Sequence, residues 1–512
     1  MSNFNEAPTT KGFYLGSPEA EGESNSRSRI NLSDVFEDYL GVLDKLKYEK
    51  FIITGRKGSG KSAIAVYINN RSKQEYNLFC TIVRGDDISF EKIIQQKETT
   101  DGESKSDEYL FKWIILVKLI ALMLSDQSIS TSKIKGIRDL SKFMQINRGF
   151  TDIHKLSTSE IVQEKGGELN IENFKPLFTL RLGKKIQIRG IKAPYYKLVS
   201  PLQETVISIL SEYQIEKGSP SEYYIIFDDL DIGYSATDSD QANRLVSLIR
   251  SAKEYNHIFA ENNIRAKIII MLRDDMAKNL VERATKAADS AKLFSSYEIP
   301  IIWYDSINFH RNEYDNPLIK LIAKRIEFNF QQKNIPYNKI NIWNSFLKEE
   351  KKINKKSPIK TILDYTFLRP RDLLLLFRKI GEYSFSIPVR IDDISRLLEE
   401  YAQDIVFEMK DELKMYFSSE ETNALLDVLR NSFKEGDMNY AYLKSLLHKN
   451  PVFTLDEATI IKIIFEHSLI GIKDLDGNLF FKYREKQNQD YKITENNDIV
   501  LHNVLKLYFK MK

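Results

Sequence analysis

The sequence predicts an α/β protein built on a parallel sheet, followed by a helical region and a small C-terminal domain. Apolar runs of strand length alternate with helical patterns; these runs occupy residues 51–54, 79–84, 223–227, 266–272 and 299–304. The runs are mostly apolar, which is typical of strands that are covered on both faces of a sheet. From Pro317 onward the strand patterns give way to amphipathic helices.

A glycine-rich octapeptide, G-R-K-G-S-G-K-S at residues 55–62, follows the first apolar run and precedes a helix-forming segment. Strand, glycine-rich loop and helix form the context of a phosphate-binding P-loop. Its glycines let backbone N–H groups point at phosphate oxygens, and the helix N-terminus adds partial positive charge. Lys61 is expected to reach the β- and γ-phosphates, and the Ser62 hydroxyl to ligate Mg²⁺. The predicted binding residues for ATP and Mg²⁺ are Gly55, Arg56, Lys57, Gly58, Ser59, Gly60, Lys61, Ser62 and Ala63.

Two acids, Asp228 and Asp229, follow the apolar run 223–227. Open parallel sheets bind ligands at the carboxyl ends of their strands. A carboxylate at this position can hold the Mg²⁺ that bridges two phosphates, and a second one can orient and deprotonate the attacking water. We therefore predict a hydrolytic site, although ordinary strand ends also carry acids.

The region after the predicted sheet reads as a helical lid over residues 316–416. Within it, T-F-L-R-P-R-D places Arg369 and Arg371 around a proline that suits the first turn of a helix. A helix N-terminus carrying arginines is a place where a nucleotide can be sensed. The alternative is a pair of surface arginines.

An insertion at residues 127–200 interrupts the alternation of strands and helices, and its second half has the short, glycine-separated segments of a β-rich structure. It holds 14 Lys and Arg against six Asp and Glu, an excess of about +8. Such a surplus favours either a solvated surface or a surface that docks a partner or nucleic acid.

The last segment, residues 417–512, combines three helical patterns, a hairpin signal at 474–478 and a closing helix from about Val500. We expect a winged-helix fold. It holds 13 basic and 14 acidic residues, a net charge of about −1, whereas modules that read DNA usually present a basic face.

Composition excludes several other classes of protein. The single cysteine, Cys80, rules out an internal disulfide and a cysteine-rich zinc site, and the six histidines lack metal-ligand spacing. Residues 1–28 are rich in Ser, Glu, Gly and Pro, which predicts a flexible tail without a signal peptide. The most apolar stretch, Trp113–Leu124, is too short to span a bilayer. We expect a cytoplasmic protein with its ATPase core at residues 29–315.

In this order the motifs resemble bacterial P-loop ATPases of the AAA+/STAND superclass, in particular an orphan family with G-R-K-G-S-G-K-S-A-I, D-D-L-D, L-R-x-D and R-P-R-D. The resemblance covers roughly residues 30–415 without the insertion. It implies that Asp228 is the Mg²⁺-side acid and Asp229 the catalytic acid. It also implies that Arg273 is a sensor arginine, and that Arg371 or Arg369 is a lid arginine.

The chain departs from this pattern in two ways. Its second acid is Asp where many AAA+ proteins have Glu, which implies slow turnover, and no arginine finger acting on a neighbouring subunit is evident. Families of this kind often belong to prokaryotic conflict systems, including anti-phage defence.

Three functions follow as hypotheses. The first is an ATP-driven switch that forms homo-oligomers and controls a separate effector protein. The second is a nucleic-acid ATPase that contacts DNA or RNA through the winged helix or the basic insertion. The third is a scaffold that binds ATP without hydrolysing it.

Overall fold

The computed structural model describes residues 7–25, 27–85, 105–132, 134, 136–146, 168–170, 192–194, 196, 198–217, 221–231, 234, 238–283, 290–304, 312–348, 357–434, 436–473, 477, 479–482 and 493–511. The chain forms two compact units. The sheet unit comprises residues 41–57 and 61–301, and the helical unit comprises residues 1–40, 58–60 and 302–512.

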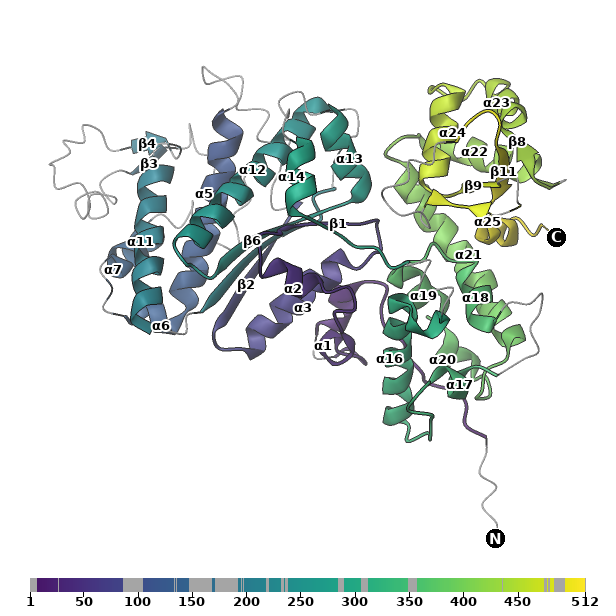
Figure 1. Ribbon diagram of the computed structural model, residues 1–512, viewed down its shortest axis with the longest axis horizontal. Helices are drawn as coiled ribbons and strands as arrows, with labels where there is room; N and C mark the ends of the chain where they lie inside the picture. Colours follow the sequence, from purple (N-terminus) through teal and green to yellow (C-terminus); the bar gives the residue numbers. More distant parts are fainter. Residues whose placement is uncertain are drawn as a thin grey trace, which may run out of the picture. The chain divides into compact units, whose positions relative to one another are not determined.

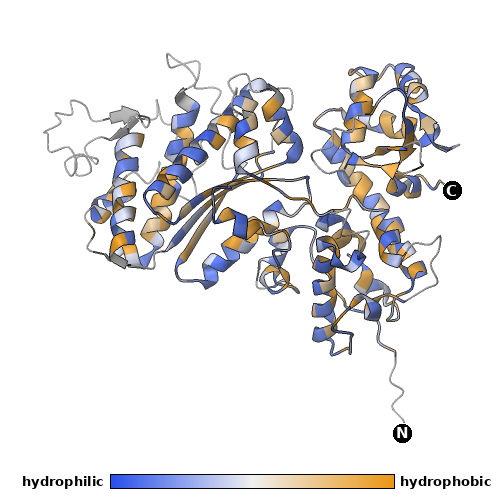
Figure 2. Cartoon of the chain, in the orientation of Figure 1, coloured by the Kyte–Doolittle hydropathy of each residue, from blue (hydrophilic) through white to orange (hydrophobic). Residues whose placement is uncertain are grey.

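The sheet unit is built on five parallel strands in the order β2-β5-β6-β1-β7. Their bounds are β1 (Ile52–Thr54), β2 (Leu78–Arg84), β5 (Glu222–Asp228), β6 (Ala266–Leu272) and β7 (Glu298–Pro300). The predicted α/β fold is confirmed, and the order is typical of a P-loop NTPase core. Figure 2 shows that these strands are hydrophobic along most of their length, because the sheet is covered on both faces.

Helices connect the strands and cover the sheet (Figure 1). They are α3 (Lys61–Gln74), α5 (Lys105–Ser125), α11 (Val199–Lys217), α12 (Ser239–Glu261), α13 (Asp274–Arg283) and α14 (Ser290–Tyr297). Helix α3 packs on β2 from one face, whereas α5 and α12 pack on β5 and β6 from the other. Helix α11 packs on α5 and so forms an outer layer. Alternating strands and helices produce this arrangement because parallel strands need a crossover connection.

The strand order places β6 between β1 and β5. Thr54 pairs with Leu272, and Phe227 pairs with Ile270. The carboxyl end of β6 therefore lies between the start of the glycine-rich loop and Asp228, and the residue that follows it is Arg273.

The first part of the helical unit contains α16 (Pro317–Gln332), α17 (Trp343–Phe346), α18 (Pro358–Leu363), α19 (Pro370–Leu376), α20 (Ile380–Tyr383) and α21 (Ile391–Leu413). Helix α16 starts as the sequence predicts, because Asn316 caps the Leu318 N–H and Pro317 occupies the first turn. These helices share one hydrophobic core with the C-terminal domain.

Residues 7–25 differ from the predicted flexible tail, because they pack on this helical region. Phe13 and Leu15 are buried in its core, and the Thr10 hydroxyl donates to Ile380 O at 2.8 Å. Glu23, in the short helix η1 (Ala20–Glu23), forms a buried ion pair with Arg325 at 2.7 Å. Composition misses this packing because the partners are about 300 residues away in the sequence.

The short helices α1 (Leu32–Val35) and α2 (Val42–Leu46) follow.

The C-terminal domain has a winged-helix-like arrangement. Its elements are α22 (Ser419–Ser432), β8 (Met438–Asn439), α23 (Tyr440–His448), α24 (Glu457–Glu466), β9 (Ile470–Lys473), β10 (Leu479–Phe480), β11 (Asp498–Leu501) and α25 (Asn503–Tyr508). The strands pair antiparallel in the order β10-β9-β11-β8. Strands β8 and β11 were not expected, and the closing helix starts at Asn503 because β11 takes up Val500.

The basic insertion is described only in part. Its described elements are α6 (Gln127–Ser130), α7 (Ile137–Ile146) and the antiparallel pair β3 (Glu168–Asn170) and β4 (Lys192–Pro194). The remainder of the predicted β-rich region lies outside the described residues. Within the part of the chain that the structure describes, no helix is both long and apolar enough to cross a membrane.

Candidate nucleotide-binding site

The glycine-rich loop adopts a backbone that requires glycine at two positions. Gly58 has φ 78° and Gly60 has φ 94°, which side-chain-bearing residues rarely adopt. A Cβ on Gly58 would also lie 2.9 Å from Arg371 Cβ and Cδ, whereas around Gly60 the nearest atom would be 4.0 Å away. The loop therefore combines a close approach at Gly58 with open space at Gly60.

Lys61 is the first residue of α3, and its side chain turns back over the loop. Its Nζ donates to Gly55 O at 2.8 Å and to Arg56 O at 3.2 Å. Desolvation lowers the pKa of this ammonium group, while the carboxylates of Asp228 and Asp274 oppose that shift. A desolvated cation held by two carbonyl oxygens is poised to exchange them for phosphate oxygens.

The acids predicted at the end of β5 occupy different environments. Asp228 is the last residue of the strand and is buried. Asp229 has φ 54°, and its carboxylate lies 3.8 Å from the Arg84 guanidinium. A Cβ on Gly85 would stand 2.3 Å from Asp229 O, so the turn holding Asp229 packs directly on the backbone after β2.

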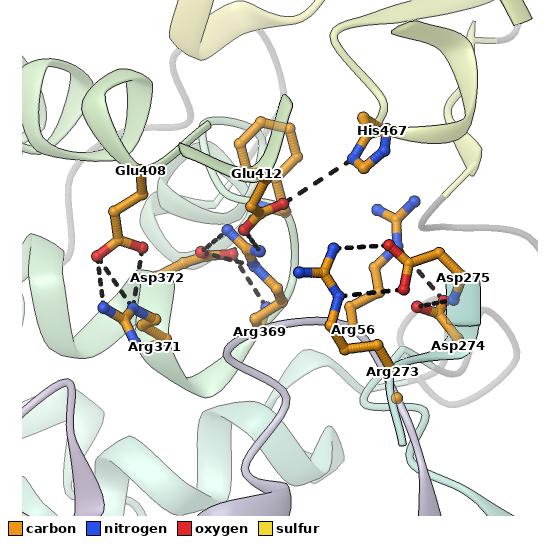
Figure 3. A network of polar contacts seen from close by, with 12 residues as sticks. Arg56, Arg273, Asp274, Asp275, Arg369, Arg371, Asp372, Glu408, Glu412 and His467 are labelled. Carbon is orange, nitrogen blue, oxygen red and sulfur yellow. Dashed lines mark hydrogen bonds and ion pairs between the residues drawn. The ribbon is translucent and has the colours of Figure 1, made fainter. Parts of the chain in front are cut away.

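Arg273 stands at the end of β6 and is bound by acids on both sides. It donates to Asp275 at 2.6 and 3.1 Å (Figure 3). It also donates to Asp231 at 3.4 Å. The neighbouring Asp274 lies 3.8 Å from Arg56 of the glycine-rich loop. Because β6 lies between β1 and β5, these contacts connect the loop, the β6 end and the β5 end within the sheet unit.

Charges at this edge of the sheet nearly cancel. The acids are Asp228, Asp229, Asp231, Asp274 and Asp275, and the cations are Arg56, Lys57, Lys61, Arg84 and Arg273. A triphosphate adds three to four negative charges, so a divalent cation would offset much of that charge. Among the described residues, no group of three or more His, Cys, Asp or Glu side chains could hold a metal ion by itself. Ser62 and Asp228 stay the predicted ligands of Mg²⁺, an ion that usually keeps waters and substrate phosphates as its other ligands.

Loop residues 58–60 belong to the helical unit and contact it. Trp303 Nε1 donates to Ser59 O at 2.8 Å, and the Arg371 N–H donates to Gly58 O at 3.4 Å. The Ser59 hydroxyl is buried and has no hydrogen-bond partner among the described residues. A buried hydroxyl without a partner is costly, so this position suits a loop that closes around an added ligand.

Arg371 and Arg369, predicted as alternatives for one role, have different surroundings in the helical unit. Arg371 is partly exposed and pairs with Glu408 on α21, donating through Nε at 2.9 and 3.0 Å and Nη2 at 2.7 Å. Arg369 is 6% exposed and pairs with Asp372 at 2.9 Å and Glu412 at 3.2 Å (Figure 3). Its guanidinium also lies over the Phe367 ring at 5.4 Å. Arg369 is thus held in a closed network, whereas the guanidinium of Arg371 is more accessible.

Residues 316–410 resemble the FunZ-associated C-terminal helical domain. The match covers α16 to most of α21, which includes Arg369, Arg371 and Glu408 but not Glu412, and it does not extend to the sheet unit. A search among curated proteins found no match to the chain.

The FunZ-associated region also contains a residue that the sequence prediction missed, Glu408. Outside that region, the sequence prediction also missed Arg84, Asp275 and Trp303. Each of these is a partner of a predicted residue. Asp275 and Asp231 had a visible signal, since both occur in acidic motifs at strand ends. Glu408 had none, because it lies 37 residues from Arg371 in an ordinary helical pattern.

Proposed function

We propose that the chain binds ATP with Mg²⁺ and hydrolyses it slowly, as a nucleotide switch of the AAA+/STAND type. The observation that carries this proposal is the position of Arg273 and Asp228 beside a glycine-rich loop whose carbonyl oxygens hold the Lys61 ammonium group. The parallel sheet is compatible with an NTPase, and the three polar positions meet at its carboxyl edge, where such sheets bind ligands.

In this proposal each residue has a defined task. The N–H groups of the loop and Lys61 bind the phosphates, and Ser62 and Asp228 hold Mg²⁺. The metal supplies charge neutralisation at the β- and γ-phosphate oxygens. Asp229 orients the attacking water and accepts its proton, with Asp231 as the next candidate. Arg273 exchanges one of its carboxylate partners for the terminal phosphate.

The switch would act through Arg371. A γ-phosphate competes with Glu408 for the Arg371 guanidinium, whereas ADP lacks the group that reaches it. The difference in contacts between ATP and ADP supplies the free energy that shifts the position of the helical unit. Oligomerisation, control of an effector protein and a role in anti-phage defence are the further parts of this proposal that the resemblance implies.

A nucleic-acid ATPase is the second candidate, and the surplus of about +8 in the insertion is the observation that favours it. The described winged helix gives it less support. Helix α24 buries Ile460, Ile461, Ile463 and Ile464, and its charged residues are one cation, Lys462, and the acids Glu457 and Glu466. A helix with this charge would not attract phosphates.

The test uses the full-length protein and measures two quantities. Equilibrium binding of fluorescently labelled ATP and ADP is recorded with Mg²⁺ and with EDTA, and phosphate release is followed in a single turnover. We expect Mg²⁺-dependent binding of ATP and slow release of phosphate. Binding without any release would favour the scaffold that only binds ATP, and the absence of binding would reject the proposal.

A further inference from the structure

A groove of about 780 Å³ runs along the helical unit between α21, α22 and the chain after α25. Phe407 on α21 lines it with 68% of its surface exposed. Leu426 on α22 and Tyr508 also line it. The groove thus combines an exposed aromatic side chain with a hollow that an apolar side chain of a partner can fill.

The groove carries a positive charge. Lys410, Arg430 and Lys510 line it against one acid, Asp427. Lys410 donates to Asn423 at 3.0 Å, and among the described residues neither Arg430 nor Lys510 forms an ion pair. An occupant with an apolar tip and acidic flanks would therefore suit this groove.

The outer helix α11 of the sheet unit offers an exposed apolar side chain with one acid beside it. Ser208, Glu212 and Ile215 are exposed at spacings of four and three residues, so they form one ridge along the helix. Ile215 has 85% of its surface exposed, and Glu212 has no ion pair among the described residues. Ser208 to Ile215 spans roughly 10 Å at the helical rise, about two turns. The groove presents two turns as well, since Gln403 to Lys410 and Asn423 to Arg430 are each seven residues apart.

We propose that the groove binds the α11 ridge of a second copy of this chain, with Ile215 against Phe407 and Glu212 beside Arg430. The two surfaces differ and lie on different units, so each copy offers both, and the contact joins copies head to tail. A contact of two helical turns is small, so assembly is weak and depends on protein concentration. This inference concerns assembly and holds whether or not the proposed site hydrolyses ATP.

The shape of the groove favours a protein helix over a nucleic acid as the occupant. The row Gln403, Phe407 and Lys410 on α21 faces the row Asn423, Asp427 and Arg430 on α22, which is the form of groove that accepts the ridge of a helix.

The experiment measures the mass of the full-length protein by sedimentation velocity over a range of concentrations, without nucleotide and with ATP and Mg²⁺. Arg430→Glu and Glu212→Arg are each expected to raise the dissociation constant of self-association at least tenfold. An equimolar mixture of the two variants, and the double variant, should restore it, because opposite charges then meet again. Recovery of affinity excludes misfolding as the cause.

Two matched controls accompany these variants. Ile215→Ser should weaken assembly, whereas Ile340→Ser should not, although Ile340 is 96% exposed and lies outside the ridge. Lys434→Glu should likewise have no effect. ATP affinity should be the same in all variants, which separates this test from that of the nucleotide site.

A monomeric wild-type protein at every concentration would overturn the proposal, as would failure of the charge exchange to restore assembly. The anisotropy of a labelled 12-nucleotide oligothymidylate tests the other occupant. If Arg430→Glu abolishes oligonucleotide binding and leaves the mass unchanged, the groove binds nucleic acid instead.

Discussion

Arg371 and Glu408 form a two-pronged ion pair, and the same arginine donates its backbone N–H to Gly58 of the glycine-rich loop. One helical turn further along α21, Glu412 binds Arg369. Two carboxylates on one helix face thus hold both arginines of the R-P-R-D motif. The pairs differ in burial, since the Arg371 and Glu408 side chains are 21% and 16% exposed, and those of Arg369 and Glu412 are 7% and 12% exposed. A solvated pair exchanges partners at lower cost.

The first prediction concerns this exchange. Arg371→Ala should leave ADP affinity nearly unchanged and reduce ATP affinity by about tenfold, which corresponds to about 1.4 kcal/mol. Glu408→Gln should raise ATP affinity and leave ADP affinity nearly unchanged, because the phosphate no longer competes with a carboxylate. Arg378→Ala is the control, as it forms a similar pair with Asp404 in a more exposed position. Equal losses of ADP and ATP affinity in Arg371→Ala would show that the arginine does not sense the terminal phosphate.

The second prediction separates binding from hydrolysis. Lys61→Ala should weaken both nucleotides, because the cation that faces the phosphates is lost, while Lys73→Ala at the other end of α3 should not. Asp229→Asn should bind ATP normally and release phosphate on the order of a hundredfold more slowly. Both are measured by equilibrium binding and single-turnover hydrolysis. Unchanged turnover in Asp229→Asn would transfer the role of base to Asp231.

The third prediction uses a glycine in the loop. Gly58→Ala adds a Cβ at φ 78° and 2.9 Å from Arg371, so it should abolish nucleotide binding as well as strain the backbone. Gly41→Ala is the matched control, because Gly41 has φ 63° and no atom within 4 Å of the added Cβ. Gly41→Ala should lower the free energy of unfolding by about 1–2 kcal/mol and leave nucleotide affinity unchanged. Thermal unfolding and ATP binding distinguish the two effects. Normal ATP affinity in Gly58→Ala would contradict the inference that nucleotide binding needs a glycine beside Arg371.

The fourth prediction concerns acid stability of the winged-helix-like domain. Burial raises the pKa of Glu421, but hydrogen bonds from the Ser418 and Thr454 backbones and the Thr454 hydroxyl lower it to about 2, against an ordinary value of 4.5. The native state therefore favours the charged form, and this stabilisation is complete above pH 4.5 and is lost as the pH falls towards 2.

Glu421→Gln should consequently destabilise the domain at pH 7 by about 0.5–2 kcal/mol, the usual range for a helix-capping interaction. The difference from wild type should shrink between pH 4.5 and pH 2. Glu420→Gln, one position earlier and exposed, is the control. Urea unfolding followed at several pH values measures both. A difference that stays constant down to pH 2 would contradict the lowered pKa.

Sequence reasoning predicted the parts of the fold that depend on local patterns. The strands of the sheet and the glycine-rich loop were readable because an apolar run, three glycines and a helix start lie within 20 residues. The order of the strands was not, because parallel pairing joins segments such as β1 and β6 that lie about 200 residues apart. The burial of Phe13 and Leu15 was not predicted for the same reason, since their partners in the core are distant in the sequence.

The candidate site shows the same limit. Residues that lie within a recognisable motif, such as Lys61 and Asp228, could be proposed from the sequence. The residues that contact them from other elements could not. Arg369 and Arg371 looked equivalent in the sequence and differ only through Glu412 and Glu408, which a helical pattern does not single out. Strands β8 and β11 were missed because they have two and four residues and depend on pairing with distant segments, β8 with β11 and β11 also with β9.

The last prediction decides between the switch and the nucleic-acid ATPase. Phosphate contacts are sensitive to salt, and log affinity for duplex DNA falls by about 0.9 per neutralised phosphate for each log unit of salt. The insertion carries Lys184, Lys185 and Arg189 close together in the sequence, whereas α24 offers the single exposed cation Lys462. Reversing the first three charges should therefore weaken any binding of DNA or RNA and reduce its salt slope, while Lys462→Glu should change neither. ATP affinity should be the same in both variants. A salt titration of labelled DNA and RNA measures the outcome. Lys462→Glu could instead abolish a steep salt-dependent affinity that the insertion variant keeps. The winged helix would then be the part that binds nucleic acid, and the nucleic-acid ATPase would replace the switch as the better account of the chain.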